Sequence, residues 1–79
     1  MTTEALEDWL VARLAEELGV PASAIDPDAP FAELGLDSMK AVAISGELET
    51  LLGRRLDPTL LWELPTVRRL AAGLAGDPA

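Results

Sequence analysis

Glycine and proline divide this 79-residue chain into apolar-periodic stretches and one long connection. In the first stretch, residues 3–18, a leucine recurs every four residues, which places Leu6, Leu10, Leu14 and Leu18 on one stripe beside Trp9. Thr2 or Thr3 can cap the start of this stretch, whereas Gly19 and Pro21 end it. The spacing therefore predicts a first helix over residues 3–18.

The pattern of apolar and capping residues after position 36 predicts three more helices. The helix over residues 37–52 starts at the N-cap residue Asp37 and ends at Gly53. A short helix over Pro58–Glu63 follows Asp57, and Thr66 caps a last helix that runs to Leu74. The inward faces of the second and last helices consist of Ala41, Ile44, Leu48, Leu51 and Leu52, and of Val67, Leu70, Ala71 and Leu74.

The connection, residues 20–36, has no sustained period and contains three prolines. Its spaced apolar residues predict an ordered loop anchored on the bundle, with single helical turns near Ala22 and Ala32; the anchors are Val20, Ile25, Phe31, Leu34 and Leu36. No segment alternates as a strand does. We therefore expect an all-α fold, a small four-helix bundle of three main helices plus one short helix, forming one domain over residues 1–79 with its core in about 3–75.

Composition excludes most catalytic chemistry. The chain has no Cys, His or Tyr, so a thiol nucleophile, a zinc thiolate and a Ser–His–Asp triad are impossible, and we expect no metal site. An enzyme would have to use carboxylates of the connection, such as Asp26, Asp28 and Glu33. We therefore expect a non-catalytic protein.

Charge and hydropathy limit the partners and the location. The net charge of −8 disfavours nucleic acids and anionic membranes and favours basic partners. No apolar run is long enough to span a membrane, and the first residues are acidic where a secretory signal is basic. We expect a cytoplasmic monomer.

Ser38 stands where the connection meets the second main helix. A hydroxyl in that first turn lies near unpaired backbone N–H groups and the positive end of the helix dipole, which favour a phosphate ester. Gly35 permits a turn that other residues avoid. Taken alone, however, Asp37–Ser38 before a helix usually means only capping.

The outward sector of the same helix is unusually apolar. It comprises Met39, Val42, Ala43 and Gly46, which we interpret as a partner-docking face; the alternative is a minor face buried under another helix. We expect Glu47 and Glu49 to be solvated, and the arginines at 54, 55, 68 and 69 to be solvated or paired locally with Asp57 or Glu63. For Trp62 we favour core packing over an acyl path or a partner contact.

The segment LGLDSMKAV resembles the signature of acyl carrier proteins, in which Leu-Gly-x-Asp-Ser opens the second helix. PFAELG, GRRLDPTLLWELPTV and RRLAAGL also resemble carrier domains of polyketide synthases, so the resemblance covers about residues 3–75. It implies a four-helix bundle in which a phosphopantetheinyl transferase, using coenzyme A and a metal ion, attaches 4′-phosphopantetheine to Ser38. The thiol of this arm would hold acyl groups as thioesters, Asp37 would lie near the transferase's metal, and the modified helix would dock partners.

The type of carrier follows from smaller departures. Peptidyl carriers of nonribosomal synthetases generally place Gly-Gly before Asp-Ser, whereas Leu36 stands here; fatty-acid carriers have a more acidic second helix than residues 37–52. We therefore expect a polyketide-type carrier, either free-standing or the first part of a synthase, served by an acyl-loading enzyme and a ketosynthase or other synthase domains. A peptidyl carrier and an unmodified helical interaction module remain alternatives.

Overall fold

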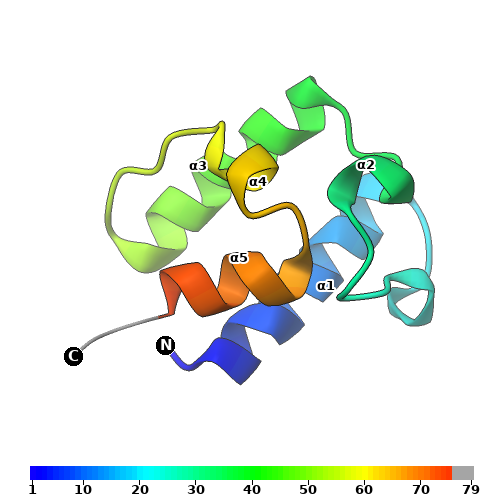
Figure 1. Cartoon of the computed structure of the whole chain (residues 1–79), viewed down its shortest axis with the longest axis horizontal. Coiled ribbons are helices and arrows are strands. Elements are labelled where there is room, and N and C mark those ends of the chain that lie inside the picture. Colours follow the sequence, from blue (N-terminus) through cyan, green and yellow to red (C-terminus); the bar gives the residue numbers. More distant parts are fainter. Residues whose placement is uncertain (76–79) are drawn as a thin grey trace.

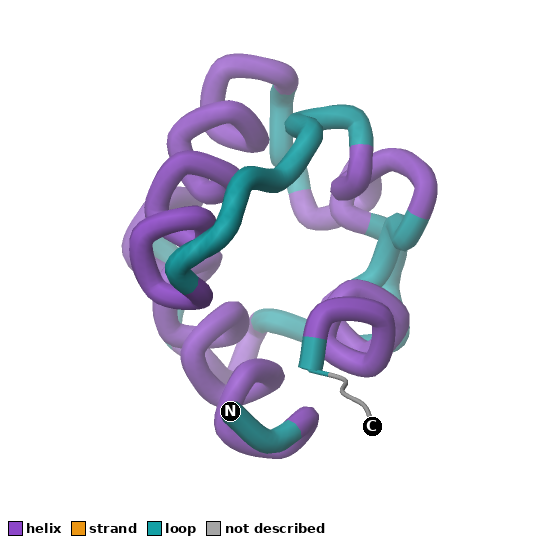
Figure 2. The backbone as a smooth tube through the Cα atoms, turned by 90° about the vertical axis from the view of Figure 1, so that its left-hand side faces the viewer, coloured by secondary structure: helices purple, strands orange, loops and turns teal. Residues whose placement is uncertain are grey.

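The computed structural model describes residues 1–75, which form helices and loops with no strand among them (Figures 1 and 2). The three main helices are α1 (Thr3–Leu18), α3 (Ser38–Leu52) and α5 (Val67–Leu74). A 3₁₀ turn, η1 (Ala22–Ala24), and two one-turn helices, α2 (Phe31–Leu34) and α4 (Leu60–Glu63), lie between them. The all-α prediction is confirmed, with α2 as a second short helix. Residues 76–79 of the expected domain lie outside the described residues.

Local chemistry sets the helix ends. The Thr2 hydroxyl caps α1 by accepting a hydrogen bond from the N–H of Ala5 (3.0 Å), and α1 and α3 end at Gly19 and Gly53, as predicted. The predicted start of the short helix at Pro58 is wrong. The Asp57 carboxylate accepts hydrogen bonds from the N–H and the hydroxyl of Thr59 (both 2.9 Å), which lowers the Asp57 pKa and holds residues 57–59 in a turn. The helix therefore starts at Leu60.

The core lies where α1 packs against α5 and where α3 packs against α1 (Figure 1). Most of the expected inward residues are buried there: Leu6, Leu10, Leu14, Ala41, Ile44, Leu48, Val67, Leu70 and Ala71. Leu51 is an exception, because its side chain is 38% exposed, and the Ser45 side chain is buried instead. Sequence reasoning did not select Ser45 because it is polar.

The connection between α1 and α3 is fastened to the start of α5. Ile25, Phe31 and Leu36 are buried anchors, as predicted, whereas Val20 is exposed. The N–H of Phe31 donates to the Pro65 carbonyl (2.8 Å), and the N–H of Arg68 donates to that of Pro27 (3.0 Å). These long-range backbone bonds fix the loop that leads into α3.

The side chains of Arg54 and Arg68 make contacts that the sequence did not predict. Arg68 pairs with Asp28 of the connection (2.6 Å) and not with Asp57 or Glu63, and this hydrogen bond raises the Arg68 pKa. Arg54 donates to the Leu74 carbonyl (3.2 Å), which links the loop after α3 to the end of α5.

None of the described helices has the length and hydropathy needed to cross a lipid bilayer.

Candidate functional site

Ser38 is the first residue of α3, and it lies exposed on the surface. Gly35 ends α2 with a φ of 96°, a left-handed conformation that strongly favours glycine. After this turn the N–H of Leu36 donates to the Phe31 carbonyl (3.1 Å), and the Leu36 side chain enters the core. Because Leu36 is anchored inside, the chain then emerges with Asp37 and Ser38 on the outside.

Asp37 caps α3. Its carboxylate accepts a hydrogen bond from the N–H of Lys40 (2.8 Å), and its carbonyl accepts one from the N–H of Ala41 (2.9 Å). The expected capping role is therefore present. The backbone N–H groups of Ser38 and Met39 stand in the first turn, where a helix provides no intrahelical acceptor. A phosphate ester on Ser38 would lie beside these donors and the positive end of the helix dipole.

The surface around Ser38 has room for an extended group. An open groove of about 320 Å³ is lined by Ser38, Met39 and Val42, and a second groove of about 390 Å³ is lined by Glu17, Asp37, Met39, Lys40 and Ala43. The exposed hydroxyl, the N–H groups of the helix start and the apolar groove together fit a phosphate-linked arm. Ser38 would hold that arm covalently, and Met39 and Val42 would flank it.

The outward face of α3 is exposed in the structure. The Met39 side chain is 82% exposed and that of Val42 is 55% exposed, and Ala43 and Gly46 are also exposed. This excludes the alternative in which another helix of residues 1–75 covers the face. Whether these four residues dock a partner stays a prediction.

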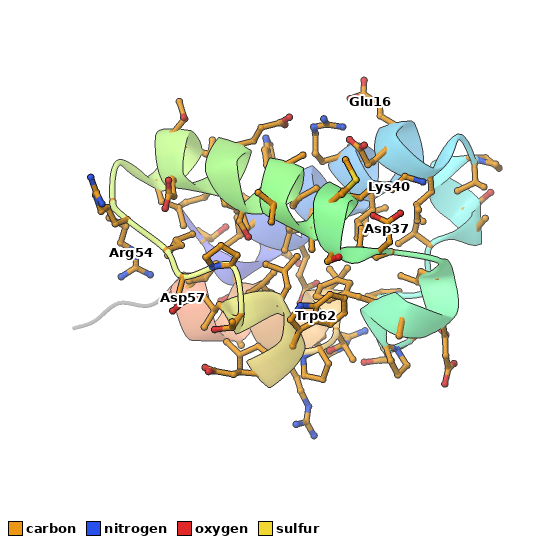
Figure 3. The ribbon with its side chains drawn as sticks, turned by 90° about the horizontal axis from the view of Figure 1, so that it is seen from above. Glu16, Asp37, Lys40, Arg54, Asp57 and Trp62 are labelled. Carbon is orange, nitrogen blue, oxygen red and sulfur yellow. The ribbon has the colours of Figure 1, made fainter. Side chains whose placement is uncertain are left out.

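The prediction that Trp62 packs in the core is wrong. Its side chain is 43% exposed, and the neighbouring Leu61 occupies the core instead. Seen from above, Trp62 lies on α4, toward the end of α3 that carries Asp37 and Lys40, whereas Arg54 and Asp57 lie toward the other end (Figure 3). Trp62 therefore adds aromatic surface near the start of α3.

Glu47 and Glu49 are engaged within the molecule and are not simply solvated. Nε and Nη2 of Arg13, in α1, donate hydrogen bonds to the two carboxylate oxygens of Glu47 (Nη2 to Oε2, 2.7 Å). This hydrogen bonding lowers the Glu47 pKa and raises that of Arg13. Glu49 accepts a hydrogen bond from the N–H of Leu56 (2.8 Å). Both contacts join segments that no local pattern connects, so sequence reasoning missed them.

Of the three carboxylates that an enzyme of this sequence would have to use, two are engaged in hydrogen bonds or ion pairs and the third is exposed on a separate element. Asp26 accepts a hydrogen bond from the N–H of Asp28 (2.9 Å), Asp28 pairs with Arg68, and Glu33 is exposed on α2. Among residues 1–75 no group of three His, Cys, Asp or Glu side chains is arranged to hold a metal ion.

Comparison with known proteins agrees with this geometry. Residues 8–74 match the family model described as a phosphopantetheine attachment site. A segment of a phenolphthiocerol/phthiocerol polyketide synthase protein from Mycobacterium tuberculosis is 46% identical over 70 residues, which cover 89% of this chain and 4% of that relative. The chain thus spans a very small part of this curated relative.

Solved structures show the same fold. A free-standing peptidyl carrier protein from Acinetobacter baumannii superposes with a TM-score of 0.89 and 40% identity, covering 92% of this chain and 91% of that one. An acyl carrier protein from Anabaena, which has a variant phosphopantetheinylation-site sequence, superposes with a TM-score of 0.87 and 35% identity, covering 95% and 85%. The chain therefore belongs to the phosphopantetheine attachment-site family of carrier proteins, which carry 4′-phosphopantetheine covalently and are not themselves catalytic.

Proposed function

We propose that Ser38 is the attachment point of 4′-phosphopantetheine and that the chain carries acyl or polyketide intermediates for a polyketide synthase. The observation that carries this proposal is the exposed Ser38 hydroxyl at the start of α3, beside an apolar groove, within a family-model match over residues 8–74. When bound, the arm supplies a terminal thiol that holds an acyl group as a thioester. The chain has no cysteine, so it cannot supply this thiol itself.

The attachment is a phosphoryl transfer carried out by a phosphopantetheinyl transferase. The Ser38 oxygen forms a bond to the phosphorus next to the pantetheine of coenzyme A, and the bond from that phosphorus to the bridging oxygen breaks. Adenosine 3′,5′-bisphosphate leaves, and the serine proton passes to a base of the transferase. In this step Ser38 is a substrate, and Asp37 both caps α3 and faces the transferase near its metal ion.

The polyketide assignment rests on two observations. Leu36 stands where peptidyl carriers generally have a second glycine, and the curated relative at 46% identity is part of a polyketide synthase. We expect an acyl-loading enzyme and a ketosynthase or other synthase domains to dock on the face formed by Met39, Val42, Ala43 and Gly46. The proposed unit is a single monomeric carrier domain, residues 1–79, that works in the cytoplasm.

Intact-mass analysis tests the attachment. After incubation with coenzyme A, Mg²⁺ and a broad-specificity transferase, the wild-type chain should gain one phosphopantetheine mass, and Ser38→Ala should gain none. Ser45→Ala is the matched control, because it removes a buried serine of the same helix and should be modified like wild type. An unmodified wild-type chain, or a modified Ser38→Ala chain, would refute the proposal.

A peptidyl carrier is the second candidate, favoured by the structural match to a free-standing peptidyl carrier protein. The cargo on protein isolated from its native host separates the two. A mass increment that fits an acyl or ketide chain supports the polyketide assignment, whereas an aminoacyl or peptidyl increment supports the second candidate.

A further inference from the structure

The contact between Arg13 and Glu47 lies at the edge of the outward face of α3. Glu47 lies one helical turn after Ala43, which belongs to that face, so it borders the face on this side. Arg13 reaches Glu47 from α1, 34 residues away, and holds both carboxylate oxygens. A bidentate arginine–carboxylate pair is among the strongest and most directional of polar contacts. The carboxylate that could have faced a partner is turned to α1.

The other two carboxylates of residues 37–52 are also engaged internally. Asp37 accepts the N–H of Lys40, and Glu49 accepts the N–H of Leu56. Lys40 reduces the net charge of residues 37–52 from −3 to −2, and Arg13 pairs with Glu47 from α1. The outward face thus combines exposed Met39 and Val42 with acids that already have hydrogen-bond donors.

This arrangement matters because the whole chain is strongly acidic, with a net charge of −8. Such a field attracts any basic protein at long range, without regard to the identity of the partner. Discrimination between partners must then come from the contact surface. An apolar patch binds an apolar partner surface more tightly, whereas a free carboxylate binds a cationic one more tightly.

We propose that Arg13 sets the partner specificity of the α3 face: by pairing with Glu47 it keeps this face apolar, so that the face selects a protein with an apolar contact surface over one with clustered lysine and arginine. Arg13 acts here as a specificity residue through Glu47, without contacting Ser38. This inference rests on the proposed function, because it assumes that partners reach Ser38 across this face.

The test compares two variants that each remove one arginine and the ion pairs it makes. Arg13→Gln frees Glu47 at the α3 face, and it also frees Glu16 and Glu17 of α1, which Arg13 contacts as well. Arg68→Gln frees Asp28 of the connection, near Glu7 and Asp26. Both variants change the net charge from −8 to −9. A double variant, Arg13→Gln with Glu47→Gln, isolates the contribution of Glu47.

The readout is kcat/KM for modification of Ser38 by a transferase whose carrier-binding surface bears lysines and arginines. We expect Arg13→Gln to be modified roughly two- to five-fold faster than wild type at low salt, the effect of about one exposed ion pair. The difference should disappear between about 25 mM and about 400 mM NaCl, because salt screens exposed charges. Arg68→Gln and the double variant should follow the wild-type salt dependence.

The outcomes separate this inference from the proposed function. If wild-type chain is never modified, the proposed function itself fails. If it is modified but Arg13→Gln shows no extra salt dependence, or Arg68→Gln shows the same gain, the specificity role of Arg13 is refuted while the attachment at Ser38 stands. Circular dichroism at each salt concentration checks that all variants keep the wild-type helix content, so that a change of slope reports docking.

Discussion

The Ser45 hydroxyl is buried in α3 without a hydrogen-bond partner among the described residues, and its side chain is only 2% exposed. A buried polar group without a partner loses its hydration and gains nothing in return. We predict that Ser45→Ala raises the free energy of unfolding by about 1 kcal/mol, measured by urea denaturation. Ser23→Ala, at an exposed position of η1, should change it by less than about 0.5 kcal/mol. A destabilised Ser45→Ala variant would mean that the hydroxyl has a partner, such as an internal water.

Asp37 has two roles that substitutions can separate. Asp37→Ala removes the cap of α3 and should lower the free energy of unfolding by about 1 kcal/mol. Asp37→Asn keeps a capping oxygen but loses the charge, so stability should stay close to wild type. If the carboxylate faces the transferase's metal ion, Asp37→Asn should still slow Ser38 modification roughly tenfold. Equal rates for Asp37→Asn and wild type would reduce Asp37 to a cap.

At the scale of the helix, α3 divides into a buried and an exposed side, and Val42 lies on the exposed side. We predict that Val42→Asp leaves the helix content unchanged, because its side chain is 55% exposed, and slows acyl transfer to a cognate condensing enzyme roughly tenfold by placing a charge in an apolar contact. Ala12→Asp adds the same charge at an exposed position of α1 and should have little effect on the rate. Unfolding of Val42→Asp as its sole consequence would assign this face to the core.

The main helices were predictable because their signals are local. The leucine spacing of α1, the cap at Asp37 and the glycines at both helix ends act within a few residues. The short α4 was harder: with only one turn, no periodicity defines its inward side, and Leu61 took the core position expected for Trp62. The prediction that Leu51 is buried failed for a related reason. Leu51 lies at the border between the two sides of α3, where tertiary packing decides exposure.

At the scale of the whole molecule, the position of Ser38 at the start of a helix was predictable, but the ion pairs that join distant elements were not. Arg13 with Glu47 and Arg68 with Asp28 join residues 34 and 40 positions apart, and either arginine had nearer acids available in the sequence. Only the packing of α1 against α3, and of the connection against α5, selects these partners. The charge character of the α3 face is therefore a tertiary property.

The Arg13–Glu47 pair should also make stability depend on pH. Because the Glu47 pKa is below its usual value of 4.5, the unfolded chain binds more protons in acid than the folded chain does. The pair's contribution, about 0.5 kcal/mol for such an exposed group, is present above the unfolded pKa and is lost as the pH falls through the folded pKa. Urea denaturation from neutral pH down to acid should show a shallower acid loss for Arg13→Gln. Glu47→Gln should also reduce the loss of unfolding free energy in acid. If both variants lose as much stability in acid as wild type does, the pairing is contradicted.

The fastening of the connection to the start of α5 limits how this gene can be recombined with those of its relatives. Residues 27–31 and 65–68 hold each other through two backbone hydrogen bonds and the Asp28–Arg68 pair. A hybrid whose crossover point falls between these segments takes one side of the junction from each parent. Hybrids that inherit both sides from one parent keep the junction intact, so we expect residues 27–68 to be exchangeable only as one block.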